Sequence, residues 1–293
     1  MKKINKSLRH LLGLSVLISM STTSFAEIIM NSGTAEGGSS ISWSSEEVNQ
    51  LMSDDFNASA NEPSPPGSAT VMTTLRPAGT VAPAAVKPAY TAPQIIDTNH
   101  FSNQPSVNAR AALVMDAQTG EVLFSKNTNT AYPIASITKL MTAVVISDAR
   151  LNMSEKITLQ QADFSCSGCK SSSSTLRAGD SMNRAEALLF ALMKSENPAA
   201  AALARTYPGG RSAFIAKMNA KAKELGMNST HFMESTGLHP GNVASARDLG
   251  ILVNTASQYG LIRQFSTTPS YDFNLGYRVL KSNNTNALVR NGG

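Results

Sequence analysis

The sequence has 293 residues, of which 42% are hydrophobic and 15% charged, and a formal net charge of +5 at pH 7. Four of its 25 basic residues lie in the first 26 positions, where no acid occurs, so the remainder carries only +1. This balance and the lack of a cluster of basic and aromatic residues argue against a nucleic-acid partner. Residues 27–106 carry −6 and residues 107–293 carry +7, which favours a carboxylate-rich substrate for the second part.

The N-terminus predicts a secretory signal peptide. An apolar run from Leu11 to Met20 follows a basic start, and the small residues Ser24 and Ala26 come next. This order is typical of a signal peptide cleaved after Ala26, and the run is too short to span a membrane. No later segment is apolar enough to do so. We therefore expect residues 1–26 to be removed and the mature protein to reach the periplasm without a transmembrane segment.

Residues 27–106 have the composition of a linker. Ser, Ala, Thr, Gly and Asn dominate, and prolines are spread from Pro63 to Pro93. Such a segment buries too little apolar surface to offset the entropy of ordering the chain. We expect a disordered linker here and a folded domain over residues 107–293.

The folded part is predicted to open with a hairpin and a buried helix. Apolar strands at residues 111–115 and 121–124 flank a run of turn residues. A helix is expected to begin near Ser136, because Pro133 cannot continue one from upstream and apolar residues recur on one helical face as far as Val145.

A short strand at residues 156–159 and further helices are predicted downstream. Asn183 and Glu186 form a capping box for an apolar helix through Met193. Two more helices are expected, one over residues 212–225, ended by Gly226, and one opened by Ser245 and Asp248.

Ser136 and Lys139 are the first candidate catalytic pair. Residues three apart share one face of a helix, so the Lys139 amine is within reach of the Ser136 hydroxyl. A desolvated neutral lysine can activate a serine nucleophile, and S-x-x-K is the first motif of penicillin-binding proteins and class A β-lactamases. The alternative is a helix-capping serine beside a solvated lysine. Ser167 and Lys170 have the same spacing, but nothing there predicts a helix.

Ser195 and Asn197 lie on a tight connection between two helices that are both expected to be buried. Pro198 suits the first position of the second helix and Asn197 its N-cap. Polar side chains in such a place need partners, so they either contribute to a site or only cap the helix. His231 and His239 are interpreted as hydrogen-bonding loop residues, because no Gly-x-Ser-x-Gly elbow accompanies them.

Cys166 and Cys169 form a C-x-x-C pair. Zinc needs more ligands than this pair supplies, and a thioredoxin-like motif needs a βαβ setting that is missing here. After export, the expectation is either a disulfide that closes a small loop or two idle thiols.

Taken in order, these segments resemble the low-molecular-mass serine DD-peptidases, and within them the D-alanyl-D-alanine endopeptidases of the penicillin-binding protein 7 type. The resemblance covers residues 107–293. The matching stretches are Pro133–Ala143, Arg184–Leu189, Ser195–Asn197, Ala222–Met227, Ser235–Leu238 and Ser245–Leu249.

The resemblance implies an α+β fold in which an antiparallel sheet is flanked by helices and joined to an all-helical lobe, with the site between them. By analogy, Ser136 attacks a D-alanyl carbonyl of a peptidoglycan stem or cross-bridge and forms an acyl-enzyme, and Lys139 accepts the serine proton. Ser195 relays a proton to the leaving amine, and Asn197 hydrogen-bonds the substrate and Lys139. β-Lactam antibiotics are expected to acylate Ser136. No metal or other cofactor is implied.

One departure from the family pattern is the absence of its third motif, Lys-Thr-Gly, from these 293 residues. That motif lies on an inner strand and supplies an oxyanion donor, whose loss costs on the order of 10²–10³ in turnover. We therefore expect the chain to be a fragment that lacks C-terminal strands and has weak activity or none.

Two other functions stay open on the sequence. One is a non-catalytic peptidoglycan-binding protein, and the other is a class A β-lactamase. The motifs also do not separate an endopeptidase from a carboxypeptidase, because both cut the same type of D-alanyl bond.

Overall fold

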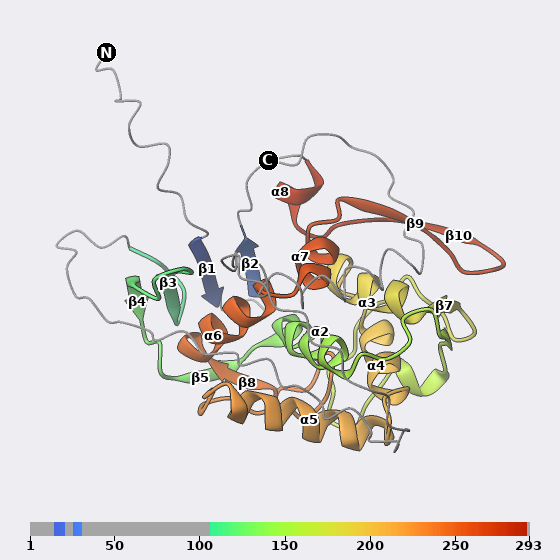
Figure 1. Cartoon of the computed structure of the whole chain (residues 1–293), viewed down its shortest axis with the longest axis horizontal. Coiled ribbons are helices and arrows are strands. Elements are labelled where there is room, and N and C mark those ends of the chain that lie inside the picture. The colour runs from blue at the N-terminus through green and yellow to red at the C-terminus, as the bar shows by residue number, and fades with distance from the viewer. Residues whose placement is uncertain (1–14, 21–25, 31–105, 292–293) are drawn as a thin grey trace, which may run out of the picture.

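The structure is a computed structural model that describes residues 15–20, 26–30 and 106–291, with side chains described for residues 106–291 (Figure 1). Apart from its ends, the predicted linker lies outside these residues. In chain order the elements are β1 (Ser15–Met20), β2 (Ala26–Met30), β3 (Ala112–Asp116), β4 (Val122–Lys126), β5 (Ala131–Pro133), the 3-10 turn η2 (Ala135–Ile137), α2 (Thr138–Ala149), β6 (Lys156–Thr158), the 3-10 turn η3 (Gln161–Asp163), β7 (Ser181–Asn183), α3 (Arg184–Met193), α4 (Asn197–Arg205), α5 (Gly210–Glu224), β8 (Val243–Ser245), α6 (Ala246–Ser257), α7 (Gly260–Ser266), β9 (Ser270–Asn274), β10 (Val279–Asn283) and α8 (Ala287–Arg290).

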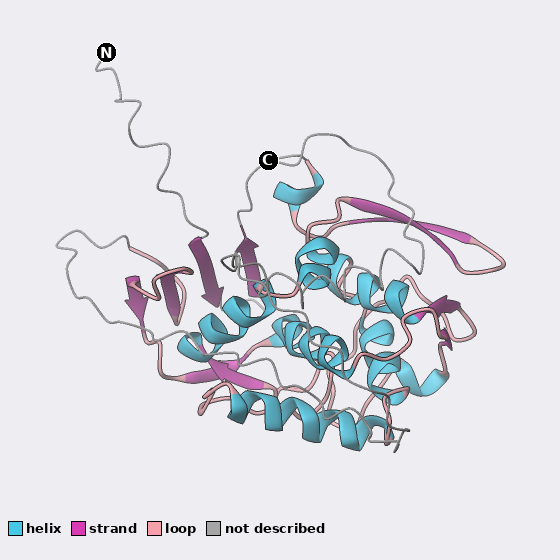
Figure 2. Ribbon diagram, viewed as in Figure 1, coloured by secondary structure: helices cyan, strands magenta, loops and turns pink. Residues whose placement is uncertain are grey.

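A four-stranded antiparallel sheet in the order β2-β1-β3-β4 forms one side of the molecule (Figure 2). The predicted hairpin is confirmed as β3 and β4. Its turn is closed by the Asp116 carboxylate, which accepts hydrogen bonds from the backbone N–H groups of Gln118 and Thr119. β1 falls within the predicted signal peptide and β2 begins at the expected cleavage point. The removal of residues 1–26 stays a prediction.

Helix α6 packs against this sheet. A Cβ atom at Gly250 would lie 2.8 Å from Leu113 Cδ2 and 3.0 Å from Met115 Sδ, so the glycine lets α6 approach β3 closely. Leu113 and Met115 form a small buried cluster there with Val122 and Ala246. The α6 helix therefore joins the sheet to the helical part of the fold.

The helical part contains the main core. α2 lies between α6 on one side and α3, α4 and α5 on the other (Figure 1), and ten of its twelve residues are buried. Arg184 is also almost fully buried, and its guanidinium is satisfied by Glu155 Oε2 at 2.5 Å and Thr206 Oγ1 at 3.0 Å. Because α2 is enclosed on several sides, a side chain at its first turn is held in a fixed place.

Several predicted helix boundaries are confirmed. Asn183 and Glu186 form the expected capping box at the start of α3, and the Ser245 side chain accepts a hydrogen bond from Asp248 N at the start of α6. Gly226 follows α5 with a φ of +77°, in the left-handed region that glycine favours after a helix. The helix expected from Ser136 instead begins with a 3-10 turn and becomes regular at Thr138.

The α+β class is confirmed by this arrangement of sheet and helices. The β9–β10 hairpin was not predicted from the sequence, although Tyr271, Phe273 and Leu280 pack on the main core. Among the described residues, no helix combines the length and the apolar character that crossing a bilayer requires.

Candidate active site

Ser136 and Lys139 meet at the start of α2. Ser136 lies in the 3-10 turn that precedes the helix and is exposed, whereas Lys139 lies in the first helical turn and is only 2% exposed. The distance from Lys139 Nζ to Ser136 Oγ is 3.1 Å. An exposed hydroxyl therefore touches a buried amine, as the spacing in the sequence predicts.

The Lys139 amine has two further partners, and both come from distant parts of the chain. Its Nζ lies 2.7 Å from Asn197 Oδ1 and 2.7 Å from the Thr236 carbonyl oxygen. With Ser136 Oγ, these acceptors match the three donors of an ammonium group. The amine is consequently fixed in position rather than free to move among rotamers.

Burial lowers the pKa of the Lys139 amine from its ordinary value of 10.5 to about 8. The negative charges of Glu234 and Glu196 oppose this shift, because they favour the charged form. A lysine with a pKa near 8 is partly neutral under mildly basic conditions. It can therefore take a proton from Ser136, which an ordinary surface lysine cannot do efficiently.

Ser195 lines the same pocket as Ser136 and Lys139, a cavity of about 160 Å³. Ser195 has a φ of +59°, which is unusual for a residue other than glycine and costs about 1–3 kcal/mol. The chain between α3 and α4 thus adopts a strained conformation at the residue that faces the pocket. Thr267 and Thr285 lie on the wall of this pocket too.

Asn197 corrects one expectation. It does not cap α4 from outside but is the first residue of that helix, and Glu196 precedes it as the N-cap. Its side chain is used elsewhere, because Oδ1 accepts from Lys139 and Nδ2 donates to Ser172 Oγ at 3.0 Å. The ion-dipole contact to the lysine thus takes the place of a helix cap.

Glu196, the residue between Ser195 and Asn197, is a buried carboxylate. It accepts hydrogen bonds from Ser174 Oγ at 2.5 Å, from Thr175 N at 3.1 Å and from Thr175 Oγ1. The connection that carries Ser195 and Asn197 is therefore tied to the segment that follows the cysteine pair.

Residues 233–242, which we call the Glu234 loop, have a role at this site that no local pattern in the sequence predicts. This loop supplies the Thr236 carbonyl that contacts Lys139, and it packs directly beneath Ser136. A Cβ atom on Gly237 would lie 1.9 Å from the Ala135 carbonyl oxygen and 2.9 Å from Ser136 N, and Gly237 has a φ of +94°. Gly237 within a Ser-Thr-Gly run was the available signal, but no local pattern links it to α2.

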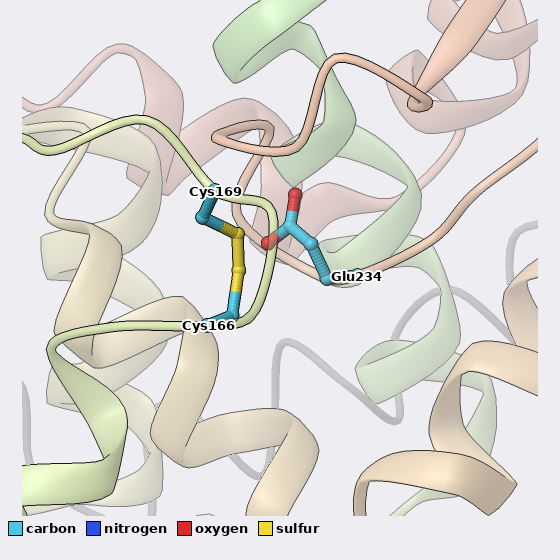
Figure 3. Close-up of side chains that lie close together, drawn as sticks. All are labelled: Cys166, Cys169 and Glu234. Carbon is cyan, nitrogen blue, oxygen red and sulfur yellow. A yellow bond between two sulfur atoms is a disulfide. The ribbon is translucent and has the colours of Figure 1, made fainter.

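Cys166 and Cys169 are joined by a disulfide. Their sulfur atoms and a Glu234 carboxylate oxygen lie within 4.8 Å of one another (Figure 3). Both sulfurs are engaged in the disulfide and so cannot ligate a metal as thiolates. His231 and His239 lie in the loop region between α5 and α6, and His239 Nδ1 accepts from Gly241 N at 2.9 Å, in line with the predicted loop role.

Comparison with known proteins assigns the fold and site to one class. The model of the D-alanyl-D-alanine carboxypeptidase family, peptidase family S11, matches residues 98–293. The chain therefore belongs to this family of serine peptidases.

Curated relatives include D-alanyl-D-alanine endopeptidases from Pseudomonas aeruginosa, 44% identical over 64% of this chain, and from Escherichia coli, 46% identical over 64% of it. The alignment covers 61% of each relative, so the chain spans about three fifths of their length. Among solved structures, the D-alanyl-D-alanine carboxypeptidase of Mycobacterium tuberculosis H37Rv has a TM-score of 0.59 and 29% identity, covering 67% of this chain and 73% of that one. The Streptomyces K15 DD-transpeptidase gives 0.57 and 29%, over 64% and 78%.

Proposed function

We propose that the protein is a serine-type D-alanyl-D-alanine peptidase that acts on peptidoglycan peptides through an acyl-enzyme on Ser136. The observation that carries this proposal is the 3.1 Å approach of the exposed Ser136 hydroxyl to the buried Lys139 amine. Family membership supports the same reaction class.

In the proposed reaction, Ser136 Oγ attacks the carbonyl carbon of a D-alanyl peptide bond while neutral Lys139 Nζ takes its proton. The tetrahedral intermediate then collapses, the peptide C–N bond breaks, and the leaving amine receives the proton from Lys139 through Ser195, which leaves Lys139 neutral again. Water attacks the resulting ester with Lys139 as the base, which releases the acyl group and restores the serine. Asn197 holds Lys139 and offers its amide to the substrate.

The endopeptidase reaction, which cuts cross-bridges, is favoured over the carboxypeptidase reaction. The two relatives with 44% and 46% identity carry the endopeptidase name, whereas relatives named carboxypeptidases, from Bacillus subtilis and Escherichia coli, are 35% and 32% identical. We place the activity in the periplasm, supported by the predicted signal peptide and by the location of peptidoglycan. β-Lactams, which resemble D-alanyl-D-alanine, are proposed as covalent inhibitors.

The test is acylation by a labelled penicillin, followed by intact mass measurement and peptide mapping. We expect one adduct, on the peptide that contains Ser136, and none in Ser136→Ala. Because these 293 residues contain no Lys-Thr-Gly donor, the adduct is expected to form slowly and to be detected after long incubation. Ser167→Ala is the matched control, because Ser167 has the same spacing to a lysine but lies in the disulfide loop. It is expected to keep the adduct.

The outcome also separates the alternative functions. Rapid nitrocefin turnover without a stable adduct identifies a β-lactamase. Binding to purified peptidoglycan that is unchanged in Ser136→Ala, without an adduct in the unaltered chain, identifies a binding protein. Cleavage of cross-linked muropeptide dimers without D-alanine release from pentapeptide monomers identifies an endopeptidase.

A further inference from the structure

Glu234 accepts four hydrogen bonds within its own loop. Its Oε2 atom accepts from Thr236 N at 2.5 Å, and Oε1 accepts from Gly237 N at 2.7 Å and from His239 N at 3.4 Å. The fourth donor is Asn242 Nδ2, at 2.9 Å. One carboxylate therefore determines the direction of three backbone N–H groups, those of residues 236, 237 and 239, in the turn beneath the active site.

Asn242 connects this turn to the start of α2. It is completely buried, and its Nδ2 atom lies 3.1 Å from Thr138 Oγ1, while its Oδ1 atom accepts from Met233 N at 2.7 Å and Glu234 N at 3.2 Å. The Asn242 carbonyl oxygen accepts from Ile134 N at 3.0 Å, just before the Ser136 turn. The network is thus fixed to both sides of the nucleophile.

The turn that Glu234 holds carries the Thr236 carbonyl, which is the third acceptor of the Lys139 amine. Fixing the N–H of Thr236 and the N–H of Gly237 fixes the peptide plane between these residues, because that plane contains the Thr236 carbonyl and the Gly237 N–H. The carbonyl oxygen then lies 2.7 Å from Lys139 Nζ. Thr142 Oγ1 reinforces the same turn from α2 by donating to the Ser235 carbonyl at 2.8 Å.

We infer that Glu234 is a positioning residue of this site, whose carboxylate orients the Thr236 carbonyl against the Lys139 amine and so sets the geometry of the Ser136–Lys139 pair. The inference rests on the proposed function. Glu234 does not touch Ser136 or the pocket that Ser136 lines; it acts through the backbone of its own loop.

Glu234 has a second effect through its charge. Two charged groups act on Lys139, Glu234 from the loop and Glu196 from the start of α4, and each raises the pKa of the amine against the lowering by burial. Around Glu234 itself lie the disulfide of Cys166 and Cys169 and the backbone of His239. Removing the Glu234 charge is therefore expected to move the titration of Lys139 to lower pH.

Three variants test the inference. Glu234→Gln keeps the volume of the side chain but removes its charge. It also replaces one accepting oxygen by an amide N–H₂ group, which cannot accept a hydrogen bond from the backbone N–H groups of the loop. Glu234→Asp keeps the charge but withdraws the oxygens. Glu224→Gln, at the half-exposed end of α5, is the matched control. The rate of Ser136 acylation by labelled penicillin is measured against pH, and the Lys139 amine is titrated by NMR with ¹³C at the lysine ε-carbon, assigned by its loss in Lys139→Met.

For Glu234→Gln we expect acylation to slow by roughly 10–100-fold, since a 1 Å misplacement of a reacting group costs about that much. The Lys139 titration should also move below its starting midpoint. Glu234→Asp should slow acylation while keeping the midpoint, and Glu224→Gln should change neither. Thermal unfolding of each variant is recorded beside these rates.

A lower unfolding temperature with an unchanged NMR midpoint and an unchanged rate per folded molecule would overturn the inference, because it is what a purely structural residue gives. Absence of any adduct on the unaltered chain contradicts the proposed function instead, and the NMR titration still tests Glu234 in that case. If Glu234→Gln does not fold, Glu234→Asp carries the test: a normal rate there rejects the positioning role.

Discussion

Two segments bring acceptors to the Lys139 amine from different sides, and they are built differently. Residues 194–197, which we call the Asn197 connection, are held by helices at both ends and by the Glu196 carboxylate, whose partners lie in residues 174–175. The Glu234 loop has no regular structure, and its own side chains, Glu234 and Asn242, bind its own backbone. The first is fixed by its surroundings and the second largely by itself.

This difference explains how each segment responds to change. A substitution in the Asn197 connection acts on helix ends and on the Ser172–Thr175 segment, so its effect spreads. A substitution in the Glu234 loop acts on one turn beneath Ser136. The two carboxylates affect the lysine in the same electrostatic direction, so geometry rather than charge distinguishes them.

The largest effect is expected when the Lys139 amine is removed, because both segments bring an acceptor to it. Lys139→Met keeps a long side chain in the buried site but deletes the amine that binds Asn197 and Thr236. Acylation of Ser136 should fall by about 10²–10⁴-fold, the usual contribution of a general base. The rate of adduct formation with labelled penicillin measures this, with circular dichroism as the control for folding. A rate within a few-fold of the unaltered chain would mean that Lys139 is not the base.

A second prediction isolates the close approach of the Glu234 loop. Gly237→Ala places a methyl group against the Ala135 carbonyl at a φ of +94°, whereas Gly276→Ala meets a similar φ of +92° with no atom within 4 Å. Both variants should lose about 1–3 kcal/mol of stability to the positive φ. Only Gly237→Ala should also lose acylation, by roughly 100-fold, because Ser136 is displaced.

Urea unfolding and penicillin acylation, measured for the two glycine variants side by side, decide this point. Equal acylation in Gly237→Ala and Gly276→Ala would show that the loop can move away from Ser136 without consequence.

The sequence predicts where the Asn197 connection lies but does not predict the Glu234 loop, and the reason is physical. The capping box of α3 and Pro198 at the start of α4 are local signals, since they act within one helical turn. Asn242 and Thr138 are 104 residues apart, and nothing in their neighbourhoods reveals that they meet. The interpretation of Asn197 as a cap failed for the same reason, because its partner Lys139 is 58 residues away.

A third prediction concerns pH and treats the two segments together. Since the Lys139 pKa is about 8, the neutral base is scarce below that pH and predominates above it. Acylation should therefore rise by about tenfold between one pH unit below and one above this value, as the fraction of neutral amine grows. The check is the acylation rate across this range with a substrate that does not ionise there. A flat profile would mean that the proton passes to another group.

The smallest effect on acylation is expected when the disulfide of Cys166 and Cys169 is removed, next to a segment that contacts both the Asn197 connection and the Glu234 loop. The segment that directly follows the Cys166–Cys169 disulfide contacts both sides, because Lys170 N donates to the Leu238 carbonyl at 3.0 Å and Ser172 Oγ accepts from Asn197 Nδ2 at 3.0 Å. Replacing both cysteines by serine should cost no more than about 2 kcal/mol of unfolding free energy, the loop-closure entropy of so short a ring. Acylation should fall less than threefold, because the Glu234 network and the helix ends still position Lys139. Ser167→Ala within the same loop is the control. A loss of more than tenfold in acylation would show instead that the disulfide, rather than Glu234, holds the turn beneath Ser136.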